Sequence, residues 1–319
     1  VSGGKVRRMP WYCCIIGVNF WASLIANRKA HAKRPRRKEK RCSGRKLALP
    51  VRAFCVGGMG LALFHRDLGG TGFPPLVILH GMLGSSRNWQ TVGRELASDY
   101  HVWALDARNH GQSPHDDTMD YADMVDDTMA WLDAQSLEKV TLMGHSMGGK
   151  TAMALACRYP ERVERLIVVD IAPKAYRWVG RRVEYDAMNA LDVARLKTRG
   201  EAEQLLEADI RDWGMRKFIT TNLDRNPNGS WRWLINLPAL TASLSILEQA
   251  NLAEADCFAG PTQFILGGKS PYVAEEDHVT IKTHFPLARI DTIPESGHNP
   301  HIEDRDKFVD LVRSSMVGH

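Results

Sequence analysis

A serine flanked by glycines is the feature of this sequence that most directly implies chemistry. Ser146 stands at the centre of residues 144–148, which read GHSMG and fit the pattern G-x-S-x-G. In that pattern the chain turns sharply from a strand into a helix, and glycines avoid collisions across the turn. The helix N-terminus adds a positive dipole where negative charge develops during acyl transfer. The pattern predicts that Ser146 is a nucleophile.

A nucleophilic serine needs a general base, and histidine is the usual one. Among the 12 histidines, His298 follows an expected strand at 288–293 and precedes the last helical pattern. That position gives the chain order serine, acid, histidine of such hydrolases. His301 is the alternative base. We expect His145 to be buried against the sheet and His110 to have a structural role.

The base needs an acid that holds its tautomer and stabilises the imidazolium. Asp170 ends the apolar run RLIVVD, and catalytic groups gather at the carboxyl ends of parallel strands. We therefore predict Asp170 as the acid, with Ser270 as an auxiliary hydrogen-bonding residue. The alternative is a cluster beyond the expected strand at 262–266, made of Glu275, Glu276 and Asp277.

Acyl transfer also requires backbone N–H donors for the oxyanion of the tetrahedral intermediate. Met147 directly follows the nucleophile and supplies one N–H. The second should come from the loop after the first central strand, which reads HGMLG over residues 80–84. We predict Met82 as that donor.

These residues need a scaffold, and four short apolar runs indicate its buried strands, at residues 76–79, 101–105, 140–143 and 163–170. Three helical patterns alternate with them, at residues 88–96, 121–135 and 147–159. The alternation predicts an α/β fold, with a mostly parallel central sheet and helices on both faces. The strand pattern resumes at 262–266 and 288–293, a helix over 304–316 follows, and residues 51–67 suggest two further short strands.

Residues 174–258 interrupt this alternation with helical patterns and no clear strand. We therefore expect one hydrolase domain over 51–319, with a helical cap inserted at about 174–258. The aromatic residues of the cap suit either an apolar acyl pocket or the cap's own core, and they are Tyr176, Trp178, Tyr185, Trp213, Phe218, Trp231 and Trp233.

Charge separates the first 50 residues from the rest. They hold 14 of the 42 Lys/Arg residues but only one of the 37 acidic residues, which leaves 28 basic and 36 acidic residues beyond them. A transit segment explains this excess of arginine with almost no acid. An anchor or membrane contact through residues 11–41 is the alternative. We expect no nucleic-acid binding, because the remainder of the chain is mildly acidic.

With these residues in hand, the chain resembles the α/β-hydrolase superfamily over residues 74–319. Within it, the chain is similar to the branch that contains alpha/beta-hydrolase domain-containing protein 11 and the YbfF-type esterases. The stretches that carry the resemblance are HGMLGSSRNW, DARNHGQS, GHSMGGKTAMALA, VVDIAP, FILGGKSPYV and SGHNPH. The resemblance implies an acid after the strand that precedes the cap, which supports Asp170, and a serine at the position of Ser270. It also implies acyl-ester or lipid-ester substrates and a mitochondrial location.

The sequence therefore predicts a serine esterase that works through an acyl-enzyme on a small-molecule acyl ester. It contains no phosphate-binding loop, metal-ligand cluster or cofactor fingerprint, so we expect neither cofactor nor metal. One alternative is another reaction on the same triad, by a thioesterase, acyltransferase or C–C hydrolase. The other is a non-catalytic ligand-binding protein on a hydrolase fold.

Overall fold

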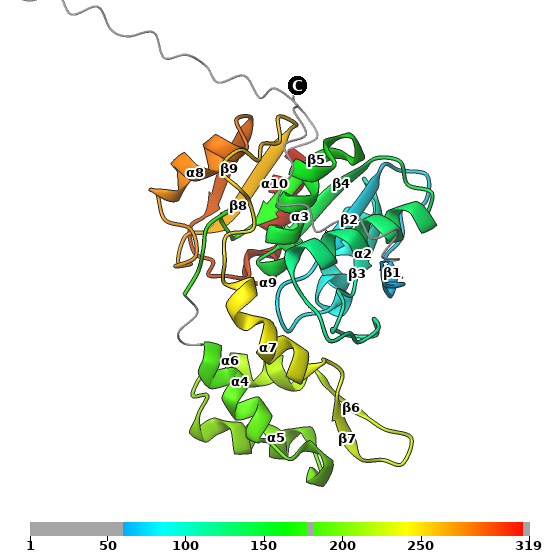
Figure 1. The fold of residues 1–319 in the computed structure, drawn as a ribbon, viewed down its shortest axis with the longest axis vertical. Helices are drawn as coiled ribbons and strands as arrows, with labels where there is room; N and C mark the ends of the chain where they lie inside the picture. Colours follow the sequence, from blue (N-terminus) through cyan, green and yellow to red (C-terminus); the bar gives the residue numbers. More distant parts are fainter. Residues whose placement is uncertain (1–59, 178–180, 315–319) are drawn as a thin grey trace, which may run out of the picture. The chain divides into compact units, whose positions relative to one another are not determined.

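A seven-stranded sheet organises the computed structural model, which describes residues 60–177 and 181–314 (Figure 1). Its strands follow the spatial order β1-β3-β2-β4-β5-β8-β9. Only β1 runs antiparallel to its neighbour, β3, and the other neighbouring pairs are parallel. The strand bounds are β1 His65–Asp67, β2 Pro75–Leu79, β3 His101–Leu105, β4 Val140–His145, β5 Val163–Val169, β8 Thr262–Gly267 and β9 Ala288–Ile293. The predicted α/β-hydrolase fold, with a mostly parallel sheet, is confirmed.

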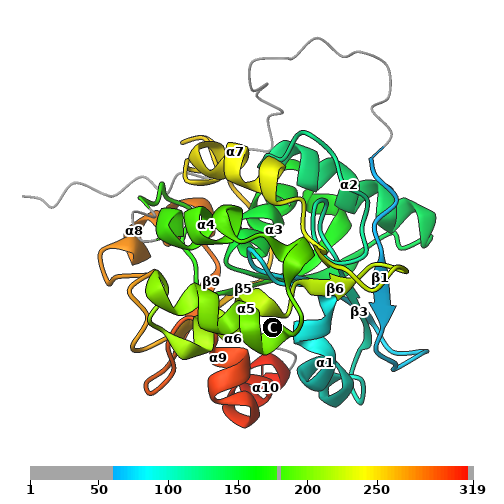
Figure 2. The same ribbon diagram turned by 90° about the horizontal axis from the view of Figure 1, so that it is seen from below.

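Helices cover both faces of this sheet. Figure 2 shows α2 and α3 on one side and α1, α9 and α10 on the other. The helix bounds are α1 Gln90–Leu96, α2 Tyr121–Ala134, α3 Met147–Arg158, α8 Asp277–His284, α9 Pro300–Glu303 and α10 Arg305–Ser314. Asp120 begins α2, because its carboxylate accepts the N–H of Asp123.

The alternation of side chains along the strands divides the core into two layers. In β2, Val77 belongs to the apolar cluster under α2 and α3, whereas Ile78 belongs to the cluster under α1 and α10. Successive side chains of a strand point to opposite faces, so a strand covered on both sides must be apolar throughout. Every residue of β4 is accordingly buried. The sheet is thus a rigid base for the loops at its carboxyl edge.

The chain leaves the sheet after β5 and returns at β8 through a mainly helical segment, here called the cap. Its helices are α4 Arg181–Ala190, α5 Arg199–Leu205, α6 Trp213–Thr220 and α7 Leu237–Leu247. The cap also contains a hairpin of β6 Leu223–Arg225 and β7 Trp231–Trp233. Sequence analysis missed this hairpin because each strand has only three residues.

The two linkers of the cap cross close to each other. The N–H of Tyr176 in the outgoing linker donates to the carbonyl oxygen of Glu248 in the returning one at 2.7 Å. Lys150 of α3, which is fully buried, donates from Nζ to the carbonyl oxygen of Gln249 at 2.5 Å. The base of the cap is therefore attached to the helix that follows Ser146.

Within the described residues, no helix is both long and apolar enough to cross a membrane. The predictions for residues 1–50, the membrane contact through 11–41 and the strands expected before residue 60 lie outside the described part of the chain.

Candidate active site

Ser146 occupies a sharp turn between β4 and α3. Its backbone has φ 51° and ψ −115°, a conformation that non-glycine residues rarely adopt. The turn requires glycine on both sides. A Cβ atom at Gly144 would lie 2.2 Å from the carbonyl oxygen of Gly148, and one at Gly148 would lie 2.4 Å from that of Leu79. The pattern G-x-S-x-G is thus explained by steric exclusion at this bend.

His298 reaches Ser146 from the loop between β9 and α9. Its Nε2 lies 3.1 Å from Ser146 Oγ, and its Nδ1 lies 2.7 Å from Asp170 Oδ2. Because the carboxylate can only accept, Nδ1 carries the ring proton and Nε2 is left to accept from the serine hydroxyl. The structure therefore brings the predicted serine, histidine and aspartate into one hydrogen-bonded chain.

Asp170 directly follows β5 and is completely buried. The N–H of Gly267 donates to its Oδ1 at 2.9 Å, and the hydroxyl of Ser270 donates to its Oδ2. These two donors come from β8 and the loop after it, beside β5 in the sheet. Hydrogen bonds of this kind let a buried carboxylate keep its charge.

The rival acids lie elsewhere. Asp277 begins α8 and forms an ion pair with Lys174, at 2.5 Å between Oδ2 and Nζ. Its Oδ2 also accepts the N–H of Ala274 at 2.9 Å. Glu275 and Glu276 are exposed. The carboxylate that accepts the Nδ1 proton of His298 is that of Asp170.

The other candidate histidines serve the scaffold. His301 is buried and stacks on Trp89, with ring centroids 4.1 Å apart, and burial lowers its pKa to about 3. Burial also lowers the pKa of His110 to about 3. His145 is buried, as expected, and its Nε2 donates to the carbonyl oxygen of His298 at 2.8 Å. It therefore anchors the loop of the predicted base.

The predicted oxyanion donors lie at the same edge of the sheet. Met147 is the first residue of α3, where N–H groups have no partner within the helix. Met82 belongs to residues 80–84, here called the oxyanion loop, which follows β2, the neighbour of β4. This loop lies directly against Ser146, since a Cβ at Gly81 would be 3.3 Å from that of Ser146.

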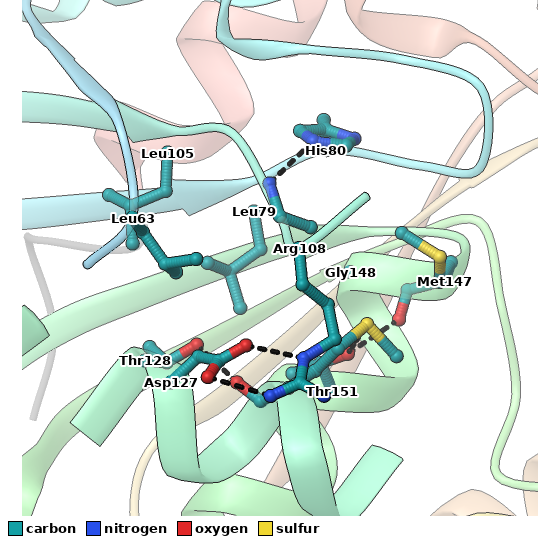
Figure 3. Close-up of a pocket in the computed structure, with 12 residues that line it drawn as sticks. Leu63, Leu79, His80, Leu105, Arg108, Asp127, Thr128, Met147, Gly148 and Thr151 are labelled. Carbon is teal, nitrogen blue, oxygen red and sulfur yellow. Dashed lines mark hydrogen bonds and ion pairs between the residues drawn. The ribbon is translucent and has the colours of Figure 1, made fainter. Parts of the chain in front are cut away.

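Buried polar groups fix the base of the oxyanion loop. His80 Nε2 accepts the N–H of Ala107 at 2.9 Å, and burial lowers the pKa of this histidine. Behind the loop, Arg108 reaches Asp127 of α2 in a two-point ion pair with distances of 2.6 and 2.9 Å (Figure 3). The cavity beside this pair has a volume of about 20 Å³, which suits a single water rather than an acyl chain.

Sequence analysis missed Tyr272, whose ring stacks on that of His298. The only signal for it is its place in the stretch FILGGKSPYV, two residues after Ser270. Several aromatic residues of the cap contribute to packing: Tyr185 is fully buried, and Trp231 and Trp233 pack on a small cluster within the cap, whereas Trp213 is exposed. Trp178 lies outside the described residues. Among the residues that the structure describes, no group of three His, Cys, Asp or Glu could hold a metal ion.

The fold and the arrangement of Ser146, His298 and Asp170 define the class: a hydrolase-fold protein with a serine on a strained strand-to-helix turn. The chain belongs to the alpha/beta hydrolase fold family, whose model matches residues 74–305. The predicted resemblance is thereby confirmed.

Two curated relatives illustrate the similarity. The sn-1-specific diacylglycerol lipase ABHD11 of Mus musculus is 35% identical over 294 residues, which are 86% of this chain and 94% of the relative. Esterase YbfF of Escherichia coli (strain K12) is 35% identical, over 75% of this chain and 91% of that protein. The solved structure of a marine microorganism esterase has a TM-score of 0.77 and 35% identity, and covers 80% of this chain and 99% of its own.

Proposed function

We propose that this protein is a serine esterase that hydrolyses carboxylic esters through an acyl-enzyme. The chain is an ester hydrolase by its family and by relatives named as esterases and lipases. The observation that carries the finer proposal is the chain of contacts from Ser146 Oγ to His298 Nε2, at 3.1 Å, and from His298 Nδ1 to Asp170, at 2.7 Å. Ser146 is then the nucleophile, His298 the base and Asp170 the acid.

In the first half-reaction, Ser146 Oγ attacks the ester carbonyl carbon while His298 Nε2 takes the hydroxyl proton. The electron pair of the carbonyl moves to oxygen, and the backbone N–H groups of Met82 and Met147 stabilise that oxyanion. When the intermediate collapses, the bond to the alkoxy oxygen breaks. His298 then returns the proton to the leaving alcohol, and the acyl group remains on Ser146.

The second half-reaction releases the acid. His298 removes a proton from water, whose oxygen attacks the acyl carbon through the same oxyanion site. Collapse breaks the bond to Ser146 Oγ, which recovers its proton from His298. Asp170 keeps the imidazole in the required tautomer and stabilises its charged form in both halves. Its full burial and two further hydrogen-bond donors support that role.

For the substrate class, we propose acyl esters of lipids. The support is that relatives with 35% identity carry the names diacylglycerol lipase and esterase. Hydrolysis of diacylglycerols and of short p-nitrophenyl esters, followed side by side, tests this preference.

The proposed chemistry is tested by reacting the full chain with a fluorophosphonate probe and with p-nitrophenyl butyrate. We expect labelling and an initial burst of p-nitrophenol from the wild type, and neither from Ser146→Ala. A wild type that shows neither reaction would favour the non-catalytic alternative. Thermal unfolding of both proteins controls for misfolding.

We also propose that residues 1–50 direct the chain to mitochondria. The support is the excess of arginine and lysine over acid in this segment. The test compares the cellular location of the full chain with that of a variant in which these basic residues are replaced by glutamine.

A further inference from the structure

The oxyanion loop contains a strained turn. The N–H of Gly84 donates to the carbonyl oxygen of Gly81 at 3.0 Å, which closes a four-residue turn around Met82 and Leu83. Leu83, the third residue of this turn, has φ 60°. A type II turn has a positive φ at that position and normally places glycine or asparagine there. A leucine is held there only when its surroundings stabilise the conformation.

Two hydrogen bonds hold Leu83 from opposite parts of the molecule. Its N–H donates to Nε2 of His110 at 3.2 Å, which is a contact within the core. Its carbonyl oxygen accepts from Nδ2 of Asn222 at 2.9 Å, which is a contact from the cap. Asn222 lies between α6 and β6 and is buried, with 4% of its surface exposed. The cap therefore supplies one of the two polar contacts that hold Leu83.

Asn222 is itself held firmly. Its N–H donates to the carbonyl oxygen of Ile219 at 3.0 Å, and its own carbonyl oxygen accepts the N–H of Leu234 at 2.7 Å. The first contact ties it to the end of α6, and the second to the residue after β7. Its amide group is thus presented to Leu83 from a fixed backbone.

We propose that Asn222 is a positioning residue that sets the oxyanion loop from the cap, so that its contact with Leu83 keeps the Met82 N–H directed at the developing oxyanion. This inference rests on the proposed serine esterase function. Asn222 acts through Leu83 and Met82 and does not touch the reacting atoms. A displaced oxyanion donor weakens stabilisation of the transition state, and loss of one donor costs about 10²–10³-fold in rate.

The test is Asn222→Asp, with Asn236→Asp as the matched control. Asn236 also belongs to the cap, and its Nδ2 donates to Asn109 Oδ1 and to the carbonyl oxygen of Asp116, each at 3.1 Å. Both substitutions exchange an amide donor for a carboxylate at a contact between cap and core. Only the first one faces the oxyanion loop.

Each variant is assayed with p-nitrophenyl acetate and with the corresponding thionoester, whose C=S group develops a negative sulfur in place of oxygen. Sulfur is a weak hydrogen-bond acceptor, so the oxyanion donors stabilise the transition state of the thionoester only slightly. We expect Asn222→Asp to lower kcat for the ester by about 10–100-fold, with a change of less than about threefold for the thionoester. Asn236→Asp should change both rates in the same proportion.

Equal losses for ester and thionoester in Asn222→Asp would overturn the inference, because they indicate a general disturbance of the site. Unchanged rates would overturn it as well. Asn222→Ala repeats the comparison if the aspartate variant fails to fold, which thermal unfolding reports. If the Ser146→Ala variant still hydrolyses the ester, the proposed function is wrong, and this inference is wrong with it. If Ser146→Ala abolishes hydrolysis but the Asn222 variants give equal losses or unchanged rates, only the inference about Asn222 is wrong.

Discussion

The ring of Tyr272 lies nearly parallel to the imidazole of His298, with centroids 3.8 Å apart and planes inclined by 13°. Tyr272 is held by its backbone, since its carbonyl oxygen accepts from Tyr176 Oη at 2.9 Å. The His145 ring also contacts the same imidazole, at 4.7 Å. His298 is therefore positioned by ring packing as well as by its two hydrogen bonds.

Replacing Tyr272 by alanine should lower kcat more than it raises KM. An aromatic pair contributes about 1 kcal/mol beyond its buried area, which corresponds to about a fivefold lower rate if the contact only orients the base. Tyr272→Phe keeps the ring and should retain activity within about twofold. Steady-state kinetics with p-nitrophenyl butyrate check this, and equal losses in the two variants would assign the effect to the hydroxyl instead.

Substitution of the predicted acid distinguishes the two candidate carboxylates. Asp170→Asn removes the acceptor that fixes the His298 tautomer, and we expect a loss of about 10⁴-fold in kcat, as in other serine triads. Asp277→Asn breaks only the ion pair with Lys174. It should leave kcat within a few-fold of the wild type. The reverse order of effects would transfer the role of acid to Asp277.

Buried neutral histidines should make the protein sensitive to acid. The pKa of His301 is about 3 in the folded chain, below the ordinary value of 6.5. Between these two values the unfolded chain binds a proton that the folded chain does not, so stability falls as the pH drops below about 6.5. One such group changes the unfolding free energy by up to about 1.4 kcal/mol per pH unit.

His301→Phe should flatten that dependence. The phenyl ring can keep the stack on Trp89, and Nδ1 of His301 has no hydrogen-bond partner to lose among the described residues. Urea unfolding at pH 7.5 and pH 5 measures the effect. The variant should lose less stability than the wild type between these conditions, and an identical loss would contradict the assignment. His110, with a pKa of about 3, still contributes a residual slope.

Lys150 should have an effect of the same sign in a more alkaline pH range. Burial lowers its pKa to about 7 from the ordinary value of 10.5, so the unfolded chain holds more protons between these two values. Stability therefore rises with pH across this window. Lys150→Met abolishes the titration, and its Tm relative to the wild type should fall between pH 7 and pH 9.5. A constant difference in Tm over that range would show that Lys150 stays charged.

Local sterics explain which parts of the site could be predicted from sequence. The bend at Ser146 demands glycines at fixed distances, so the proposed nucleophile can be recognised from five consecutive residues. The strands of the sheet could also be predicted from the sequence, because strands buried on both faces must be continuously apolar. His298 and Asp170 could be proposed from their places at strand ends, but their pairing depends on the order of strands in the sheet.

Contacts between distant segments account for what sequence analysis missed. Asn222 and Leu83 are separated by 139 positions, and nothing near either residue indicates the other. Nothing in the sequence around Tyr272 indicates that the loop after β8 places its ring on His298. The three-residue strands of the cap hairpin lie below the length at which alternation becomes recognisable.

The backbone at Ser146 and at Asp170 has φ 51° in both cases. A left-handed conformation costs a residue with a side chain about 1–3 kcal/mol, and glycine is nearly exempt. Thermal stability and catalytic activity therefore favour different residues at these two positions. A Ser146→Gly variant should have a higher Tm than the wild type and should lose all hydrolysis. Attempts to make the enzyme more heat-resistant should for that reason begin in the helices and loops remote from this edge of the sheet.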